Sequence, residues 1–188
     1  MKVIILQENL NQGLTICSRF VAPRPQLPIL ANILLKTEKG RLKLSATDLE
    51  MGVNIWVGGK IEKEGEITIS AKTVNEFVAS LPPEKVNLEL KENNLIVSST
   101  FSKSVFPTIA AADFPKIPGF PKKTALSMSL SLFSQSVAQV AFAAATDEGR
   151  PVLTGVLLKP KDKGFSLVAT DGYRLSVKTI HDTRYTIQ

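Results

Sequence analysis

Residues that support redox and metal chemistry are scarce in this chain. Its 188 residues include one cysteine, Cys17, and one histidine, His181. A single cysteine cannot close a disulfide within the chain, and these two residues cannot supply the ligand set of a zinc or iron–sulfur site. We therefore expect no metal and no cofactor. Cys17 is interpreted as a small apolar core residue, and His181 as an exposed residue at the end of a strand.

Long apolar segments are also missing. The best apolar run, residues 137–145, is short and contains Gln139, whereas a membrane-spanning helix needs about 20 apolar residues. The apolar residues at the start are followed at once by Gln7 and Glu8, which leaves them shorter than the core of a signal peptide. We expect a cytoplasmic protein without membrane contact. Its 44% hydrophobic and 21% charged residues are typical of a globular chain and exclude disorder, collagen and coiled coil.

The common catalytic signatures are absent as well. The sequence holds no GxxxxGK[ST], GxGxxG, HExxH or GxSxG pattern. Two aspartates at equivalent places in the sequence, Asp48 and Asp171, are the best candidate pair of carboxylates for acid and base roles. Each ends an apolar run, however, and Asp171-Gly172 is a turn signal, so we interpret both as turn residues. We expect no catalytic residues; the enzyme alternative predicts loss of turnover when either aspartate is replaced.

Positive charge, by contrast, is in excess. The chain has 23 Lys and Arg against 17 Asp and Glu, a net charge of +6, which fits either phosphate-rich partners or an ordinary solvated surface. Arg19 and Arg24 flank the end of the first predicted helix, and Lys72 opens the second. Side by side on one sheet, the two helices would present these side chains as a stripe that contacts phosphates without reading bases. Few aromatic residues lie near them, so base stacking is not expected.

The strongest positive signal is an internal repeat with a period of 123 residues. Residues 28–48 and 151–171 are identical at nine of 21 positions, where chance gives about one. The preceding segments, 10–21 and 133–144, both carry apolar residues at helical spacing. Each copy is therefore predicted to contain an amphipathic helix, a proline-containing turn and two strands. Because so long a period does not fit a solenoid, we infer a duplicated domain whose second copy is about half complete.

The order of elements predicts an α+β fold, in which two helices per domain pack on antiparallel sheet. The first copy is itself two rounds of strand, helix and several strands. The predicted strands are 2–6, 33–36, 41–46, 52–60, 67–70, 86–90, 95–99 and 103–106, and the predicted helices are 8–21 and 71–81.

Prolines crowd the stretch that follows. Four of them lie between residues 107 and 121, at a density that does not fit a central strand or a helix interior. We interpret this stretch as the interdomain linker. The predicted organisation is a first domain over residues 1–120 and the first half of a second domain over residues 121–188.

Several motifs together resemble one known family. The segments RPQLPIL (24–30), ATDLE (46–50), ADFP (112–115), RPVLTG (150–155) and ATDGYRL (169–175) are similar, in order and spacing, to the bacterial sliding clamps, the beta subunits of DNA polymerase III. The resemblance covers the whole chain. It implies a DNA-clamp fold with three similar domains per subunit, of which the chain holds one and a half. It also implies a homodimeric ring with helices lining the hole.

The implied function is that of a processivity factor rather than an enzyme. Such a clamp encircles double-stranded DNA and tethers polymerase III subunits, the clamp loader and repair proteins through short peptides. The alternative is a basic protein-interaction module that does not encircle DNA and does not depend on Arg24 or Lys72. With one and a half domains, residues 1–188 alone are expected not to close a ring.

The resemblance also assigns residues. Arg24 and Lys72 match positions that contact DNA on the inner face, and Arg19 joins them on the predicted stripe. The family's hydrophobic peptide pocket is matched by Leu153, Thr170, Gly172, Tyr173, Arg174 and Leu175. Tyr173 stands where many members have histidine. The repeat supports this assignment, since residues 172–175 differ from residues 49–52 of the first copy; the alternative is that Leu153 and Leu175 are merely core residues.

Overall fold

The computed structural model describes residues 1–22, 25, 27–119, 128–147, 149–161 and 164–181. It divides into two compact units, Met1–Gly119 and Phe120–Gln188, which we call unit 1 and unit 2. In the described ranges, no helix is both long and apolar enough to cross a bilayer.

Unit 1 combines antiparallel sheet with two helices. Its helices are α1 (Gln7–Cys17) and α2 (Ala71–Ser80), and short 3-10 turns follow α1 (η1, Ser18–Phe20), precede β2 (η2, Pro28–Ala31) and follow β9 (η3, Ala111–Asp113). The strands are β1 (Lys2–Leu6), β2 (Asn32–Glu38), β3 (Arg41–Thr47), β4 (Gly52–Val57), β5 (Lys60–Lys63), β6 (Glu66–Ser70), β7 (Lys85–Lys91), β8 (Asn94–Ser98) and β9 (Lys103–Ile109). Neighbouring strands pair in the order β4-β3-β2-β6-β9-β8-β7-β1-β5. The α+β prediction is confirmed.

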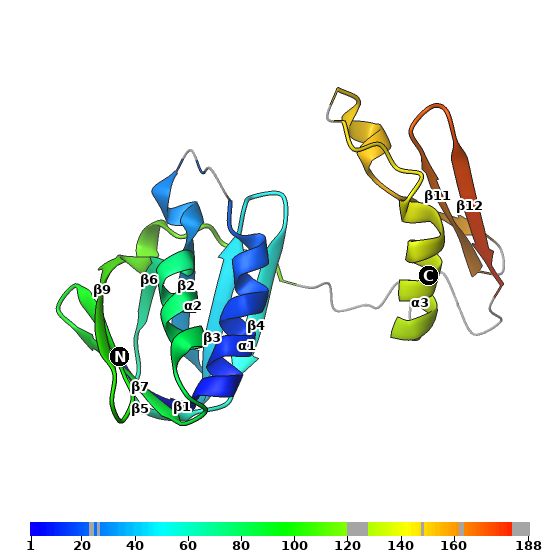
Figure 1. The fold of residues 1–188 in the computed structure, drawn as a ribbon. Helices are drawn as coiled ribbons and strands as arrows, with labels where there is room; N and C mark the ends of the chain where they lie inside the picture. The colour runs from blue at the N-terminus through cyan, green and yellow to red at the C-terminus, as the bar shows by residue number, and fades with distance from the viewer. Residues whose placement is uncertain (23–24, 26, 120–127, 148, 162–163, 182–188) are drawn as a thin grey trace. The chain divides into compact units, whose positions relative to one another are not determined.

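The two helices lie against one face of the sheet (Figure 1). They run in opposite directions: Gln7 at the start of α1 donates from Nε2 to the carbonyl of Val78 near the end of α2, at 2.7 Å. Thr15, near the end of α1, donates to Asn75 at 3.3 Å. Every second residue of a strand points to the helix-covered face of the sheet, and apolar residues recurring about every 3.6 positions form one stripe along each helix. These strand residues and helix stripes pack together as one continuous core.

Three predicted boundaries in unit 1 were wrong. The α-helix ends at Cys17 rather than at residue 21, since the chain tightens into η1 and Val21 is extended. The strand predicted over 52–60 is divided at Gly58-Gly59 into β4 and β5; a Cβ on Gly59 would stand 2.9 Å from the carbonyl oxygen of Ile4. Strand β9 continues through Pro107, which is tolerated because the next residue, Thr108, donates its N–H toward Asn93, leaving the proline nitrogen on the opposite side.

Unit 2 repeats the first half of unit 1. Helix α3 (Leu130–Ala141) packs on a three-stranded antiparallel sheet of β10 (Leu157–Lys161), β11 (Gly164–Thr170) and β12 (Leu175–Ile180), and η4 (Pro151–Thr154) precedes β10. Shifting η2, β3 and β4 by 123 residues reproduces the bounds of η4, β11 and β12. The predicted duplication is confirmed at the level of elements.

Candidate functional site

The loop between β11 and β12 is a tight turn built around Asp171. The Thr170 hydroxyl accepts the N–H of Gly172 at 3.0 Å and donates to the carbonyl of Arg174 at 2.7 Å. Asp171 Oδ1 accepts the N–H groups of Tyr173 and Arg174, each at 2.9 Å. Gly172 has φ +92°, a left-handed conformation that favours glycine. Thr170 and Gly172, both predicted site residues, therefore shape this turn.

Unit 1 contains the same turn. Thr47 and Asp48 make the equivalent bonds, with Asp48 Oδ1 accepting from Glu50 and Met51 at 3.0 and 2.6 Å. The repeated aspartates thus hold their own turns, as the sequence predicted, and each belongs to a different unit. No His, Cys, Asp or Glu cluster that could hold a metal ion occurs in the described part of the chain.

Arg174 is fixed beside the turn by two further contacts. Its Nε donates to Asp171 Oδ2 at 2.9 Å, and its guanidinium lies over the Phe142 ring, 5.9 Å from the ring centre. The backbone N–H donors of Arg174 and Tyr173, together with the Arg174 charge, lower the pKa of Asp171 below its ordinary value. The stem and charge of Arg174 are thereby held in one place.

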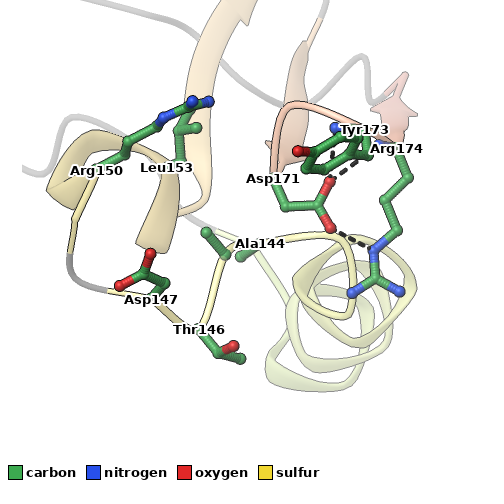
Figure 2. Close-up of a pocket in the computed structure, with 9 residues that line it drawn as sticks. Ala144, Thr146, Asp147, Arg150, Leu153, Asp171, Tyr173 and Arg174 are labelled. Carbon is green, nitrogen blue, oxygen red and sulfur yellow. Dashed lines mark hydrogen bonds and ion pairs between the residues drawn. The ribbon is translucent and has the colours of Figure 1, made fainter.

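A pocket of about 310 Å³ lies between this turn and η4 (Figure 2). Three predicted residues line it, namely Leu153, Tyr173 and Arg174. A backbone hydrogen bond holds Leu153 in position: its carbonyl accepts the N–H of Ala145 at 2.9 Å. Tyr173 is 98% exposed and forms part of the open rim. Leu175 does not line the pocket and is 66% exposed, so it is not a core residue of unit 2.

The sequence prediction missed part of this pocket. Its remaining lining residues are Ala144, Ala145, Thr146, Asp147, Arg150 and Asp171. The Arg150 side chain comes from the opposite side to Arg174 and reaches Gly172, where a Cβ would stand 3.3 Å from its Nη1. The signal that could have revealed it is the repeat: the positions 123 residues before Arg150 and Arg174 are Leu27 and Met51, so both charges are specific to the second copy.

The candidate DNA-facing residues belong to unit 1. Lys72 lies in the first turn of α2 and Arg19 in η1, and both are exposed. Because the helices are antiparallel and η1 contacts α2, the two side chains lie at the same end of the helix pair. Arg24 lies outside the described residues. Cys17 is fully buried on α1, and this burial raises the pKa of its thiol to about 12, as suits an inert core residue.

Comparisons with known proteins agree with this architecture. The sequence profile of the DNA polymerase III beta subunit, N-terminal domain, matches residues 1–118, and that of the central domain matches residues 127–185. The beta sliding clamp of Synechococcus elongatus is 35% identical over 181 residues, covering 94% of this chain and 48% of the relative. That of Synechocystis is 32% identical over 186 residues, with the same two coverages.

Solved structures give the same result. The DNA polymerase III subunit beta of Pseudomonas aeruginosa has a TM-score of 0.92 at 29% identity, covering 100% of this chain and 52% of that one. A second structure of the P. aeruginosa sliding clamp, bound to griselimycin, has a TM-score of 0.91, also at 29% identity, with the same two coverages. The chain spans about half the length of the relatives it matches. It belongs to the family of bacterial DNA polymerase III beta subunits, the beta sliding clamps.

Proposed function

We propose that this chain acts as part of a ring-shaped subunit that encircles duplex DNA and tethers the replicative polymerase. The observation that carries the proposal is family membership over both units, together with the exposed Lys72 on α2 and Arg19 on η1 at one end of the helix pair. A tether that slides needs a few weak backbone contacts and no base readers, since phosphate contacts carry no sequence information. Retention on DNA then comes from the closed ring and not from affinity.

Binding of partner peptides is assigned to the pocket of unit 2. Its floor of Leu153 and two alanines, with Arg150 and Arg174 on the sides, suits a short extended peptide with an apolar anchor. A P. aeruginosa relative binds griselimycin, which supplies a probe for this pocket. Replacing Leu153 by alanine is expected to weaken griselimycin at least about fivefold, the usual consequence of truncating an apolar side chain on which a ligand packs. Leu175 does not line the pocket, so Leu175→Ala should weaken griselimycin less than Leu153→Ala.

Encirclement of DNA is tested with the full-length protein. The protein is loaded onto nicked circular DNA and passed over a sizing column, where it should co-elute with the circle and be released when the DNA is linearised. Arg24→Ala, Lys72→Ala and Arg19→Ala should each lower the salt slope of direct DNA binding by about 0.9 for every phosphate that the variant no longer neutralises. Lys91→Ala, which removes an exposed cation paired with Glu89 on β7, serves as the control. Equal retention on circular and linear DNA would contradict the ring.

A further inference from the structure

Another cavity lies in unit 1, on the face of the sheet away from the helices. Its volume is about 380 Å³, and it is bounded by strands β2, β3, β4 and β6 and by residues 111–117, which follow β9. Alternate strand residues such as Leu35 and Leu44 are buried in the core beneath the helices, so the residues between them face the cavity. The 111–117 segment is held in place by Phe114, which is buried against η2. Both walls of the cavity therefore lie within unit 1.

Two lysines of the cavity face each other across the sheet. Lys36 on β2 and Lys43 on β3 are directly opposite partners, an arrangement in which like charges destabilise a strand pair. Lys116 adds a third ammonium group from the other wall, and no carboxylate pairs with it in the described part of the chain. The lining also includes Glu38 and Glu66. Three lysines against two glutamates leave the cavity with a net positive charge.

The glutamates leave donors of the two sheet lysines to spare. Glu66 accepts from Lys36 at 2.6 Å, and a lysine ammonium carries three N–H donors. Glu38 lies 3.7 Å from Lys43, beyond hydrogen-bond distance. Glu38 instead accepts the indole N–H of Trp56 at 3.0 Å. The cavity therefore offers N–H donors and positive charge to a ligand that accepts hydrogen bonds.

The floor of the cavity adds a neutral amide donor. Ser45, which is 2% exposed, donates from Oγ to Asn54 Oδ1 at 2.7 Å. The NH₂ group of Asn54 has no hydrogen-bond partner among the described residues. In unit 2 the equivalent residues are Val168 and Val177, which pair across β11 and β12 in the same register. The polar pair is therefore a property of unit 1 that the fold itself does not require.

We propose that this cavity binds the phosphate group of a small organic phosphate. The ammonium groups of Lys36 and Lys43 and the amide of Asn54 donate to it from the sheet, and Lys116 donates from the 111–117 segment. Lysine acts as a point charge that suits a tetrahedral phosphate, whereas the arginine fork better matches a planar carboxylate. The cations among the lining residues are all lysines.

The rest of the lining indicates where the organic part of the ligand lies. Leu34, Phe114 and Ile117 form an apolar side of the same cavity. A cavity of this size, apolar on one side and with a few convergent polar groups on the other, suits a small molecule. The site lies in a different unit from the peptide pocket, so this inference does not depend on the proposed function.

The probe for the test is phenyl phosphate, which combines a phosphate with an apolar ring. It is titrated into the 188-residue protein at constant pH and ionic strength, and binding is followed by amide shifts in ¹H–¹⁵N NMR spectra. The shifts should saturate and should centre on Lys43, Asn54 and residues 111–117. Inorganic phosphate should shift the same amides but bind more weakly, and benzoate, with a carboxylate on the same ring, should bind at least about fivefold more weakly.

Protein variants locate the binding. Lys43→Gln and Asn54→Val should each weaken phenyl phosphate at least about threefold, since each removes a donor to the phosphate. Asn54→Val introduces the residue that the same strand position has in unit 2. Lys116→Gln changes an exposed side chain, so its similar effect would not come from unfolding. Lys91→Gln is the control, because it removes the same charge from β7 and should leave binding unchanged.

Three outcomes overturn the inference. The first is the absence of saturable shifts with phenyl phosphate. The second is equal weakening by Lys91→Gln and Lys43→Gln, which would mean that the phosphate responds only to overall charge. The third is benzoate binding as tight as that of phenyl phosphate, which would mean that the cavity does not select phosphate.

Discussion

The Asp171 carboxylate shows how single residues fix the geometry of the pocket. Its oxygens accept two backbone N–H groups and one guanidinium N–H, so the ionised form is favoured and the pKa lies below the ordinary 3.8. A group with a lowered folded pKa adds stability that is present above its unfolded pKa and lost as the pH falls through the folded value. The turn should therefore hold Arg174 in place at neutral pH and release it only in acid.

This expectation is tested by NMR titration of the Asp171 side-chain carboxyl. In the wild-type protein its pKa should lie below 3.8. Arg174→Met, which introduces the residue found at the equivalent Met51, removes the guanidinium but keeps both backbone donors. The pKa of Asp171 should then rise only part of the way toward 3.8, because the hydrogen bonds from the backbone N–H groups are the largest cause of its lowering. A full return to 3.8 in this variant would contradict that order of causes.

The third residue of the same turn has a left-handed conformation in both copies. It is Leu49 with φ +79° in unit 1 and Gly172 with φ +92° in unit 2. A side chain in this region costs about 1–2 kcal/mol. Gly172→Ala should therefore destabilise unit 2 by about 1 kcal/mol, and Leu49→Gly should leave unit 1 unchanged or slightly stabilised, since the greater chain entropy of glycine offsets the relief. Urea unfolding measures the change in the free energy of unfolding for both variants. Equal destabilisation by the two substitutions would contradict this prediction.

At the scale of elements, the repeat made most of the fold predictable. A period of 123 residues predicted helix, turn and strands in both copies, because alternating and helical apolar patterns are local properties of the sequence. Asp48 and Asp171 were correctly placed in turns for the same reason. The packing of residues 111–117 was not predicted: four prolines favoured a linker, and only the structure shows Phe114 and Ile117 packed with Ile29 and Leu30. Arg150 was missed because its approach to Gly172 joins segments distant in the sequence.

Helix packing differs between the copies at one equivalent position. In α1 it is Gly13, where a Cβ would stand 2.7 Å from Leu44 Cδ1 and 3.1 Å from Val57. In α3 it is Ser136, which is 1% exposed and whose hydroxyl has no hydrogen-bond partner among the described residues. Helix α1 therefore approaches its sheet more closely than a side chain permits, whereas α3 accepts a small side chain but leaves its polar atom unpaired.

Opposite effects of alanine are expected at these two sites. Gly13→Ala should destabilise unit 1 by about 1 kcal/mol, because overpacking costs about 1–3 kcal/mol and the better helix propensity returns about 1 kcal/mol. Ser136→Ala should stabilise unit 2 by about 1 kcal/mol, since it removes a buried hydroxyl without a partner. Urea unfolding measures the first, and amide hydrogen exchange in β11 measures the second. A stabilising Gly13→Ala would show that Leu44 can move aside freely.

At the scale of the whole molecule, the two units differ in how much core each possesses. Among the described residues, the main core of unit 1 contains 23 buried apolar residues, and that of unit 2 contains six. Unit 2 in addition exposes Leu157, Leu158 and Val177 on its small sheet. Because stability grows with the apolar surface that folding buries, unit 2 should be the weaker of the two.

Unfolding of the 188-residue chain should therefore occur in two steps, and the sequence provides a built-in reporter. The single tryptophan, Trp56, belongs to unit 1, where its indole donates to Glu38 at 3.0 Å and Lys43 lies over its ring. Tryptophan fluorescence should change only in the second step, at higher urea concentration than the first decrease of far-UV circular dichroism. Amides of β11 should also exchange faster than those of the equivalent β3. Coincident transitions by both probes would contradict this expectation, because they would mean that the two units unfold as one cooperative body.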